Sequence, residues 1–126
     1  MFSQINHIAM ISHQYPTLER FYRAMFKLQP SKRGDNDAEA SAVVGDGYVG
    51  LNILPRRDGY VGGIDHFGMV VVSLDEVLDR MKSHQGSAAV KRPSTRPFAA
   101  WSANDPDGNV IDLAERKGGN LKDVYA

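Results

Sequence analysis

The sequence predicts an α+β fold built from two similar halves, and three observations support this prediction. First, INHIAM at 5–10 recurs as IDHFGM at 64–69, with His7 and His66 at the same place in each copy. Second, an amphipathic helical pattern follows each copy. Third, short strand-like segments separated by turn dipeptides follow each helical pattern. Because self-similarity indicates repeated units, each half of about 60 residues should form a strand, a helix and then two or three strands.

In the first half, INHIAMIS should form the opening strand and residues 15–28 a helix. Pro16 fits within the first helical turn, where its missing N–H costs nothing. The segments ASAVVG and YVGLNIL should then form a hairpin, because the Asp46-Gly47 pair between them is a typical turn dipeptide. The polar residues 32–40 read as a loop around a poorly marked strand. The apolar residues of the helix share one stripe: Leu18, Phe21, Tyr22, Met25 and Phe26.

In the second half, IDHFGMVVVS should form the opening strand and residues 73–85 a helix with its own apolar stripe. Ser73 is a suitable N-cap with Glu76 three residues on, and Gly86 is a suitable stop. A weak segment near SAAV should follow, and then PFAAWSAN, the turn DPDGN and the strand VIDLAE. The tail 117–126 has no clear period.

Composition narrows the classes of function. Fifteen basic residues balance 15 acidic ones, so no net charge attracts the chain to nucleic acid or to an anionic membrane. Without cysteine, disulfides, thiolate metal sites and cysteine nucleophiles are excluded. The N-terminus lacks the features of a signal peptide, and MVVV at 69–72 is far too short to cross a bilayer. We therefore expect one cytoplasmic domain over residues 1–126, with no nucleic-acid or membrane partner.

Two short motifs resemble ligand-binding loops but do not meet their requirements. GDGYVG at 45–50 satisfies G-x-G-x-x-G, yet the strand-like LNILP follows it instead of the helix that would hold a pyrophosphate. DPDGN resembles a calcium loop, but its glycine comes too early and no glutamate follows at the right distance. We interpret both as turns and expect no nucleotide cofactor.

Successive side chains along a strand point to opposite faces of the sheet. In four of the predicted strands, one face therefore carries a polar side chain next to a small residue. The pairs are His7 with Ala9, Asn52 with Gly50, His66 with Gly68, and Asp112 with Ala114. Two imidazoles and a carboxylate that converge on a cavity can bind a divalent metal. The alternative is that both histidines are structural groups which a duplication preserved by descent. Glu115 is a rival carboxylate, but alternation places it on the opposite face; His13 and His84 read as surface residues.

The chain resembles the vicinal oxygen chelate superfamily, which includes glyoxalase I, bleomycin resistance proteins, methylmalonyl-CoA epimerase and extradiol dioxygenases. The resemblance rests on INHIAM with its helix, on GIDHFGMVV and on DPDGNVIDLAE, and it covers roughly residues 4–116. It implies two βαβββ modules, at about 4–58 and 62–116. These would form a cupped, open eight-stranded mixed sheet with helices on the outer face. A homodimer is common in the family.

The resemblance also implies metal ligands from the first and last strands of each module, which map to His7, Asn52, His66 and Asp112. Two of these residues, Asn52 and Asp112, depart from the usual family pattern, because glutamate is common at both positions. Asn52 would be a weak fourth ligand. His7, His66 and Asp112 remain a two-histidine-one-carboxylate set, suited to Fe, Mn, Ni or Zn with positions left for substrate.

Two classes of function follow from the resemblance. The first is a metal-dependent lyase, isomerase or dioxygenase acting on a small substrate that chelates the metal through adjacent oxygens. Because Asn52 removes the obvious base, a standard glyoxalase I is disfavoured. The second is a metal-free sequestering protein of the bleomycin-resistance type. Aromatic walls would come from Tyr48, Tyr60, Phe98 and Trp101, or these residues pack in the core. Arg96 would be the basic pocket residue. Other basic residues also lie near strand ends and could attract an anionic ligand, or they form a solvated rim: Arg56, Arg57, Lys91 and Arg92.

Overall fold

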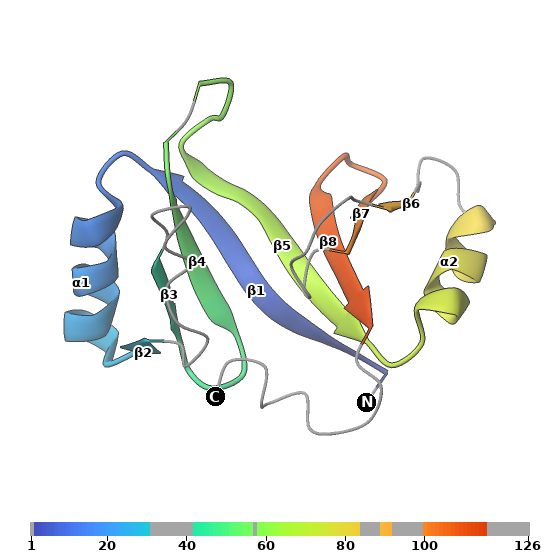
Figure 1. The fold of residues 1–126 in the computed structure, drawn as a ribbon, viewed down its shortest axis with the longest axis horizontal. Coiled ribbons are helices and arrows are strands. Elements are labelled where there is room, and N and C mark those ends of the chain that lie inside the picture. The colour runs from blue at the N-terminus through green and yellow to red at the C-terminus, as the bar shows by residue number, and fades with distance from the viewer. Residues whose placement is uncertain (1, 31–41, 57, 84–88, 92–99, 116–126) are drawn as a thin grey trace. The chain divides into compact units, whose positions relative to one another are not determined.

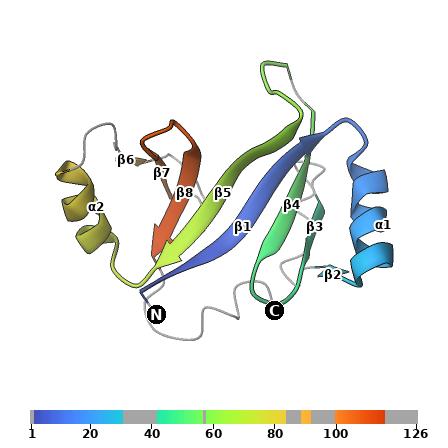
Figure 2. The same cartoon turned by 180° about the vertical axis from the view of Figure 1, so that it is seen from behind.

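The computed structural model describes residues 2–30, 42–56, 58–83, 89–91 and 100–115 (Figure 1). These residues fall into two compact units. We call the described residues between 6 and 65 the first module. Residues 2–5 and the described residues between 66 and 115 form the second module. Figure 2 shows the same elements from behind.

The first module contains most of β1 (Ser3–Ser12), then α1 (Tyr15–Phe26), β2 (Gln29–Pro30), β3 (Ala42–Gly45) and β4 (Gly50–Pro55). Its strand order is β2-β3-β4-β1. The first strand pairs with the last in parallel, and the other two pairings are antiparallel. The helix packs against β3 and β4. This is one βαβββ unit.

The second module contains most of β5 (Gly63–Val71), then α2 (Leu74–Lys82), β6 (Ala89–Lys91), β7 (Trp101–Asn104) and β8 (Val110–Glu115). Its strand order, β6-β7-β8-β5, and its strand directions match those of the first module. The helix packs against β8. The expected α+β class, the mixed strand pairing and the two βαβββ modules are therefore confirmed.

The repeat extends to the register of the strands. In the first module Ala9 lies opposite Asn52, and in the second Gly68 lies opposite Asp112. Each small residue follows its histidine by two positions, so the histidine and the last-strand polar residue share one face of the sheet in both modules. The paired backbones thus place His7 with Asn52, and His66 with Asp112.

Both helices start where the sequence predicts, and both end earlier than predicted. Pro16 lies in the first turn of α1, and the side chain of Ser73 accepts a hydrogen bond from the backbone N–H of Glu76 at 3.3 Å. The first helix ends before residue 28 because Lys27 adopts a left-handed conformation with φ 56°. The second ends at Lys82 because the hydroxyl and N–H of Ser83 both donate to the carbonyl of Arg80. Gly86 lies outside the described residues.

Both predicted turns are present. The Asp46 carboxylate accepts hydrogen bonds from two backbone N–H groups at 2.7 and 2.8 Å, and Gly47 has φ 90°. The Asp105 carboxylate of DPDGN makes the same kind of turn, with Gly108 at φ 86°. A Cβ at Gly45 would lie 2.7 Å from a carbonyl oxygen, so only glycine fits there. GDGYVG is thus a turn followed by β4.

Two weakly marked strands differ from expectation in place or extent. A strand was expected around residues 32–40, which lie outside the described residues, and the two-residue β2 precedes them. The strand near SAAV is β6, and PFAAWSAN contributes β7 only from Trp101 onward. None of the described helices is long and apolar enough to span a membrane.

Candidate metal centre

His66 and Asp112 form the chemical centre of the second module. His66 lies on β5 two residues before Gly68, and Gly68 lies opposite Asp112 on β8. This register brings His66 Nε2 to 3.0 Å from Asp112 Oδ2. The two side chains are 15% and 4% exposed. An imidazole and a carboxylate are therefore held together away from solvent, as alternation along the strands predicts.

The spacing of these two atoms suits a divalent metal ion. Imidazole nitrogen and carboxylate oxygen bind a divalent ion such as Zn²⁺ at about 2.0–2.2 Å, so two ligands of one ion lie about 3.0 Å apart in octahedral geometry and about 3.4 Å apart in tetrahedral geometry. The 3.0 Å separation of Nε2 and Oδ2 meets this requirement. A proton can hold the same two atoms together as a hydrogen bond, so proton and metal would compete for the pair.

The first module holds its histidine differently. His7 and Asn6 are both buried, and His7 Nδ1 lies 2.6 Å from Asn6 Oδ1. Because an amide oxygen only accepts hydrogen bonds, this contact assigns the proton to Nδ1 and leaves Nε2 as the basic nitrogen. Asn6 was missed in the sequence because alternation places adjacent residues on opposite faces. The only indication was a polar residue before each histidine, Asn6 and Asp65.

Asn52 lies at the position of the first module that Asp112 occupies in the second. Its Oδ1 is buried and has no hydrogen-bond partner in the described part of the chain. Leaving such an acceptor unsatisfied costs about 1–3 kcal/mol, so native structures rarely contain one. A carbonyl oxygen of this kind can bind a hard cation or a ligand N–H. Asn52 Oδ1 therefore needs a polar partner that the described residues do not supply.

Comparison with known proteins places the chain in a family. The family model of the Glyoxalase/Bleomycin resistance protein/Dioxygenase superfamily matches residues 4–113. The chain belongs to this superfamily. No curated protein matches the sequence.

Solved structures with the same fold are distant in sequence. Methylmalonyl-CoA epimerase from Mycobacterium tuberculosis is 18% identical, with a TM-score of 0.66 over 91% of this chain and 89% of that one. A hypothetical protein from Bacillus halodurans is also 18% identical, with a TM-score of 0.64 over 94% and 97%. A methylmalonyl-CoA epimerase in complex with methylmalonyl-CoA and NH4+ is 15% identical, with a TM-score of 0.64 over 91% and 95%. These likenesses show the fold.

The rival carboxylate of this glyoxalase-superfamily chain is engaged elsewhere. Glu115 is exposed, and its Oε1 accepts a hydrogen bond at 3.0 Å from the N–H of Leu74. It thereby satisfies one of the free donors at the start of α2. His13 is exposed, and His84 lies outside the described residues.

The predicted substrate-pocket residues are only partly described. Tyr48 is exposed in the Asp46 turn of the first module, and Trp101 is half-buried on β7 of the second. Phe98 and Arg96 lie outside the described residues. Of the other residues considered for the pocket, Tyr60, Arg56 and Lys91 are exposed, whereas Arg57 and Arg92 lie outside the described residues.

Proposed function

We propose that this chain is a divalent-metal-dependent enzyme of the glyoxalase/dioxygenase type, acting on a small substrate that chelates the metal through adjacent oxygens. His66, Asp112 and His7 would hold the ion, with Asn52 as a weak fourth ligand. The observation that carries the proposal is the buried pair of His66 Nε2 and Asp112 Oδ2 at 3.0 Å. A nitrogen and an oxygen at this spacing are suited to Fe, Mn, Ni or Zn.

Three features of the first module support a role for His7 and Asn52. The strand register makes them the counterparts of His66 and Asp112. The hydrogen bond to Asn6 leaves His7 Nε2 able to coordinate. The buried Asn52 Oδ1 offers an oxygen that needs a partner.

A divalent ion bound by these residues would act as a Lewis acid that stabilises negative charge on the substrate oxygens. The residues of the chain then have separate tasks. His66 and Asp112 supply one nitrogen and one negative charge, and Asn6 orients the imidazole of His7. Asn52 can orient a substrate but cannot accept a proton, because an amide has no basic site near neutral pH. The reaction therefore does not use residue 52 as a base, which argues against a standard glyoxalase I.

The substrate we propose carries two oxygens able to chelate one ion. Methylmalonyl-CoA, present in one structural neighbour, has this chemistry, with a thioester oxygen and a carboxylate on one short unit. A CoA ester of a dicarboxylic acid is therefore the first substrate class to test.

The alternative is a metal-free sequestering protein of the bleomycin-resistance type. The observation in its favour is Asn52, since an uncharged amide stands where a charged ligand would strengthen metal binding. In that case Asn52 Oδ1 would accept a hydrogen bond from the sequestered molecule. The two functions differ in whether the chain needs a metal ion and in whether it converts the molecule it binds.

We also propose that the chain forms a homodimer. Large apolar side chains are exposed in both modules, and three of them, Phe21, Met25 and Phe26, lie on α1. Clustered exposed apolar residues commonly mark an interface. Light scattering at high micromolar concentration should give twice the mass of one chain, whereas a monomer under these conditions would contradict the proposal.

Calorimetry with Mn(II), Fe(II), Ni(II) and Zn(II) tests the metal-dependent function. We expect one ion per chain for the wild type, and loss of that binding in His66→Ala. His13→Ala is the matched control, because His13 is an exposed histidine that should leave the affinity unchanged. If the wild type binds no metal more tightly than His66→Ala, the enzyme proposal fails and the sequestering function leads.

A further inference from the structure

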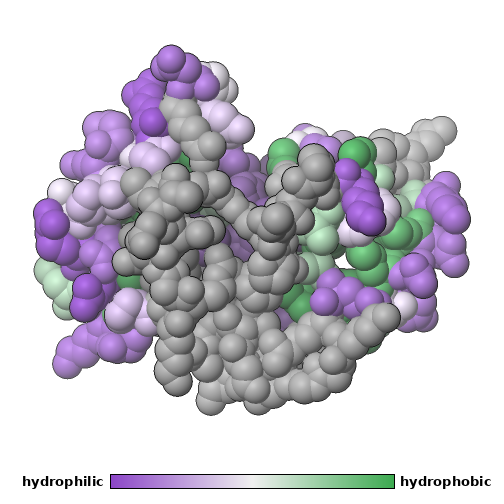
Figure 3. Space-filling model, in the orientation of Figure 1, coloured by the Kyte–Doolittle hydropathy of each residue, from purple (hydrophilic) through white to green (hydrophobic). Residues whose placement is uncertain are grey.

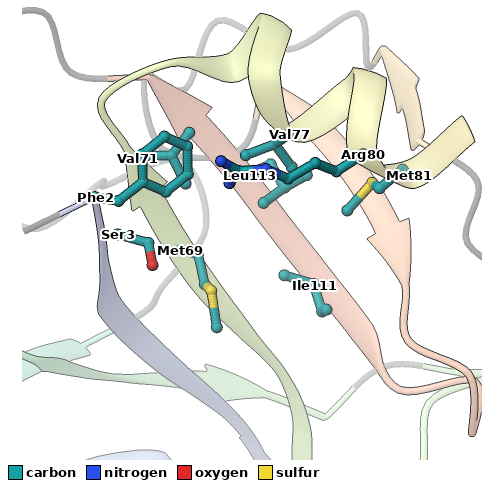
Figure 4. Close-up of a pocket in the computed structure, with 9 residues that line it drawn as sticks. All are labelled: Phe2, Ser3, Met69, Val71, Val77, Arg80, Met81, Ile111 and Leu113. Carbon is teal, nitrogen blue, oxygen red and sulfur yellow. The ribbon is translucent and has the colours of Figure 1, made fainter. Parts of the chain in front are cut away.

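An apolar cavity of about 310 Å³ lies between α2 and the sheet of the second module (Figure 4). Its wall on the sheet side comes from β5 and β8, and its cover comes from α2. Apart from the first residues of the chain, the apolar lining consists of Met69, Val71, Val77, Met81, Ile111 and Leu113. In Figure 3 hydrophobic surface is visible around α2.

This cavity is separate from the candidate metal centre. Met69 and Leu113 line the cavity and lie opposite each other in the register of β5 and β8. Asp112 precedes Leu113 by one residue, so its side chain points to the other face of the sheet. The cavity is therefore on the face that α2 covers, and the metal centre is on the opposite face.

The helix does not close over this face. No residue of α2 is buried, and Val77 and Met81, which line the cavity, are only half-buried. A cavity with an apolar lining offers water few hydrogen bonds and so favours an apolar occupant. Its volume lies at the lower end of the range of about 300–1,000 Å³ that is typical of small-molecule sites. The occupant should therefore be small and largely apolar.

One positive charge stands at one end of the cavity. Arg80 reaches from α2 toward Phe2 in Figure 4, and its guanidinium carbon lies 4.8 Å from the centre of that ring. Both residues line the cavity. Arg80 also faces Glu76 on its own helix, but the nearest N–O distance is a long 3.9 Å. Met69, Met81 and Ile111 lie away from this end and carry no charge.

We propose that the cavity binds a small single-chain amphiphile with an apolar tail and an anionic head, such as a medium-chain carboxylate. The head pairs with Arg80, whose planar guanidinium suits a carboxylate. The tail lies between α2 and the two strands, along Met69 and Ile111. The binding site is independent of the metal centre.

Titration with decanoate, using decanol as an uncharged probe with the same tail, tests this proposal. Trp101 is the only tryptophan and pairs with Leu113, a cavity residue, so its fluorescence provides the readout. Below the micelle-forming concentration, decanoate should bind in an approximately one-to-one ratio. Arg80→Gln should weaken the binding of decanoate about tenfold and leave the binding of decanol unchanged, since only the charged hydrogen bond is lost. Glu76→Gln should tighten decanoate by removing a competing carboxylate.

The other helix provides a matched control. Arg23 pairs with Glu19 on α1 with the same four-residue spacing, and neither residue lines the cavity, so Arg23→Gln removes a similar ion pair and should leave both affinities unchanged. Val77→Phe should abolish binding of both probes by filling the cavity while Trp101 stays the only tryptophan, and Met69→Phe replaces this variant if circular dichroism shows a fold defect. Absence of decanoate binding in the wild type overturns the proposal. Equal binding of decanoate by wild type and Arg80→Gln, or unchanged binding after the cavity is filled, also overturns it.

Discussion

The two modules have the same strand order and strand directions, and they differ in the residue that bonds the histidine of each. In the second module, the last strand supplies a carboxylate, Asp112, which bonds His66 at 3.0 Å. In the first module, the matching residue is the amide Asn52, and His7 bonds its own neighbour, Asn6. His66 thus has a carboxylate partner on the last strand of its module, whereas His7 has an amide partner beside it on its own strand.

The two modules thus differ in the charge of their last-strand polar residue although their strand registers match. A buried carboxylate needs a positive partner, which a protonated imidazole or a metal ion supplies. A buried amide is neutral, so it needs only a hydrogen bond, and Asn52 Oδ1 finds none in the described part of the chain. The second module thus carries the charge of the proposed centre, and the first contributes neutral ligands. The following substitutions test that division.

The largest effect on metal affinity is expected from Asp112→Asn, which makes the second module resemble the first. Loss of an outer-shell partner costs about 10–100-fold in metal affinity, so loss of the charged ligand itself should cost about 100-fold or more. Calorimetry with Mn(II) and Zn(II) measures the change. Glu115→Gln is the control, because that carboxylate bonds the start of α2 instead. An Asp112→Asn variant with wild-type affinity would contradict the assignment of charge to the second module.

The reverse exchange, Asn52→Glu, should make the first module resemble the second. Without metal, burying the added charge should lower the free energy of unfolding by about 2 kcal/mol. Metal should restore that stability and bind more tightly than to the wild type. Thermal unfolding with and without Mn(II) measures both effects, and Asn52→Gln controls for the longer side chain. If metal stabilises the Gln and Glu variants equally, residue 52 does not face the ion.

Asn6→Ala should have an intermediate effect because it removes the group that orients His7. We expect metal affinity to fall by about tenfold, in the range of other outer-shell losses. The free energy of unfolding should also fall, by about 1–3 kcal/mol, since the buried His7 N–H loses its acceptor. Asn6→Asp retains an acceptor oxygen and should recover most of the affinity. A drop in stability with unchanged metal binding would limit Asn6 to a structural role.

The smallest effect concerns the Asp105 turn of the second module. Hydrogen bonds from the side chain and backbone of Asn109 lower the pKa of this carboxyl below its usual value of 3.8. A lowered folded-state pKa means that the charge stabilises the fold above the unfolded pKa, and that this stabilisation is lost as pH falls through the folded pKa. Asp105→Asn should therefore lower Tm slightly near neutral pH. The difference from wild type should shrink as the pH falls below 3.8 and through the lowered folded-state pKa. A difference in Tm that stays constant as the pH falls would contradict this role of the Asp105 carboxylate.

The parts of the structure that the sequence predicted depend on local patterns. Strand alternation placed His66 and Asp112 on one face, and Asp-Gly pairs marked both hairpin turns, because these features follow from backbone geometry within a few residues. The left-handed Lys27 was missed since glycine is the usual residue there. The bond between Asn6 and His7 depends on side-chain rotation, which alternation does not describe. The cavity under α2 depends on how closely a helix approaches its sheet, and no residue pattern encodes that distance.

We propose that one metal ion is held by a histidine from each module. Pulsed electron paramagnetic resonance of the Cu(II)-loaded protein tests it most directly, because the spectrum counts imidazole nitrogens bound to the ion. We predict two copper-bound imidazoles in the wild type and one in His7→Ala. In His66→Ala we predict either one bound imidazole or no bound copper. His13→Ala should retain two. A single imidazole in the wild type, or two that persist in His7→Ala, would contradict the account.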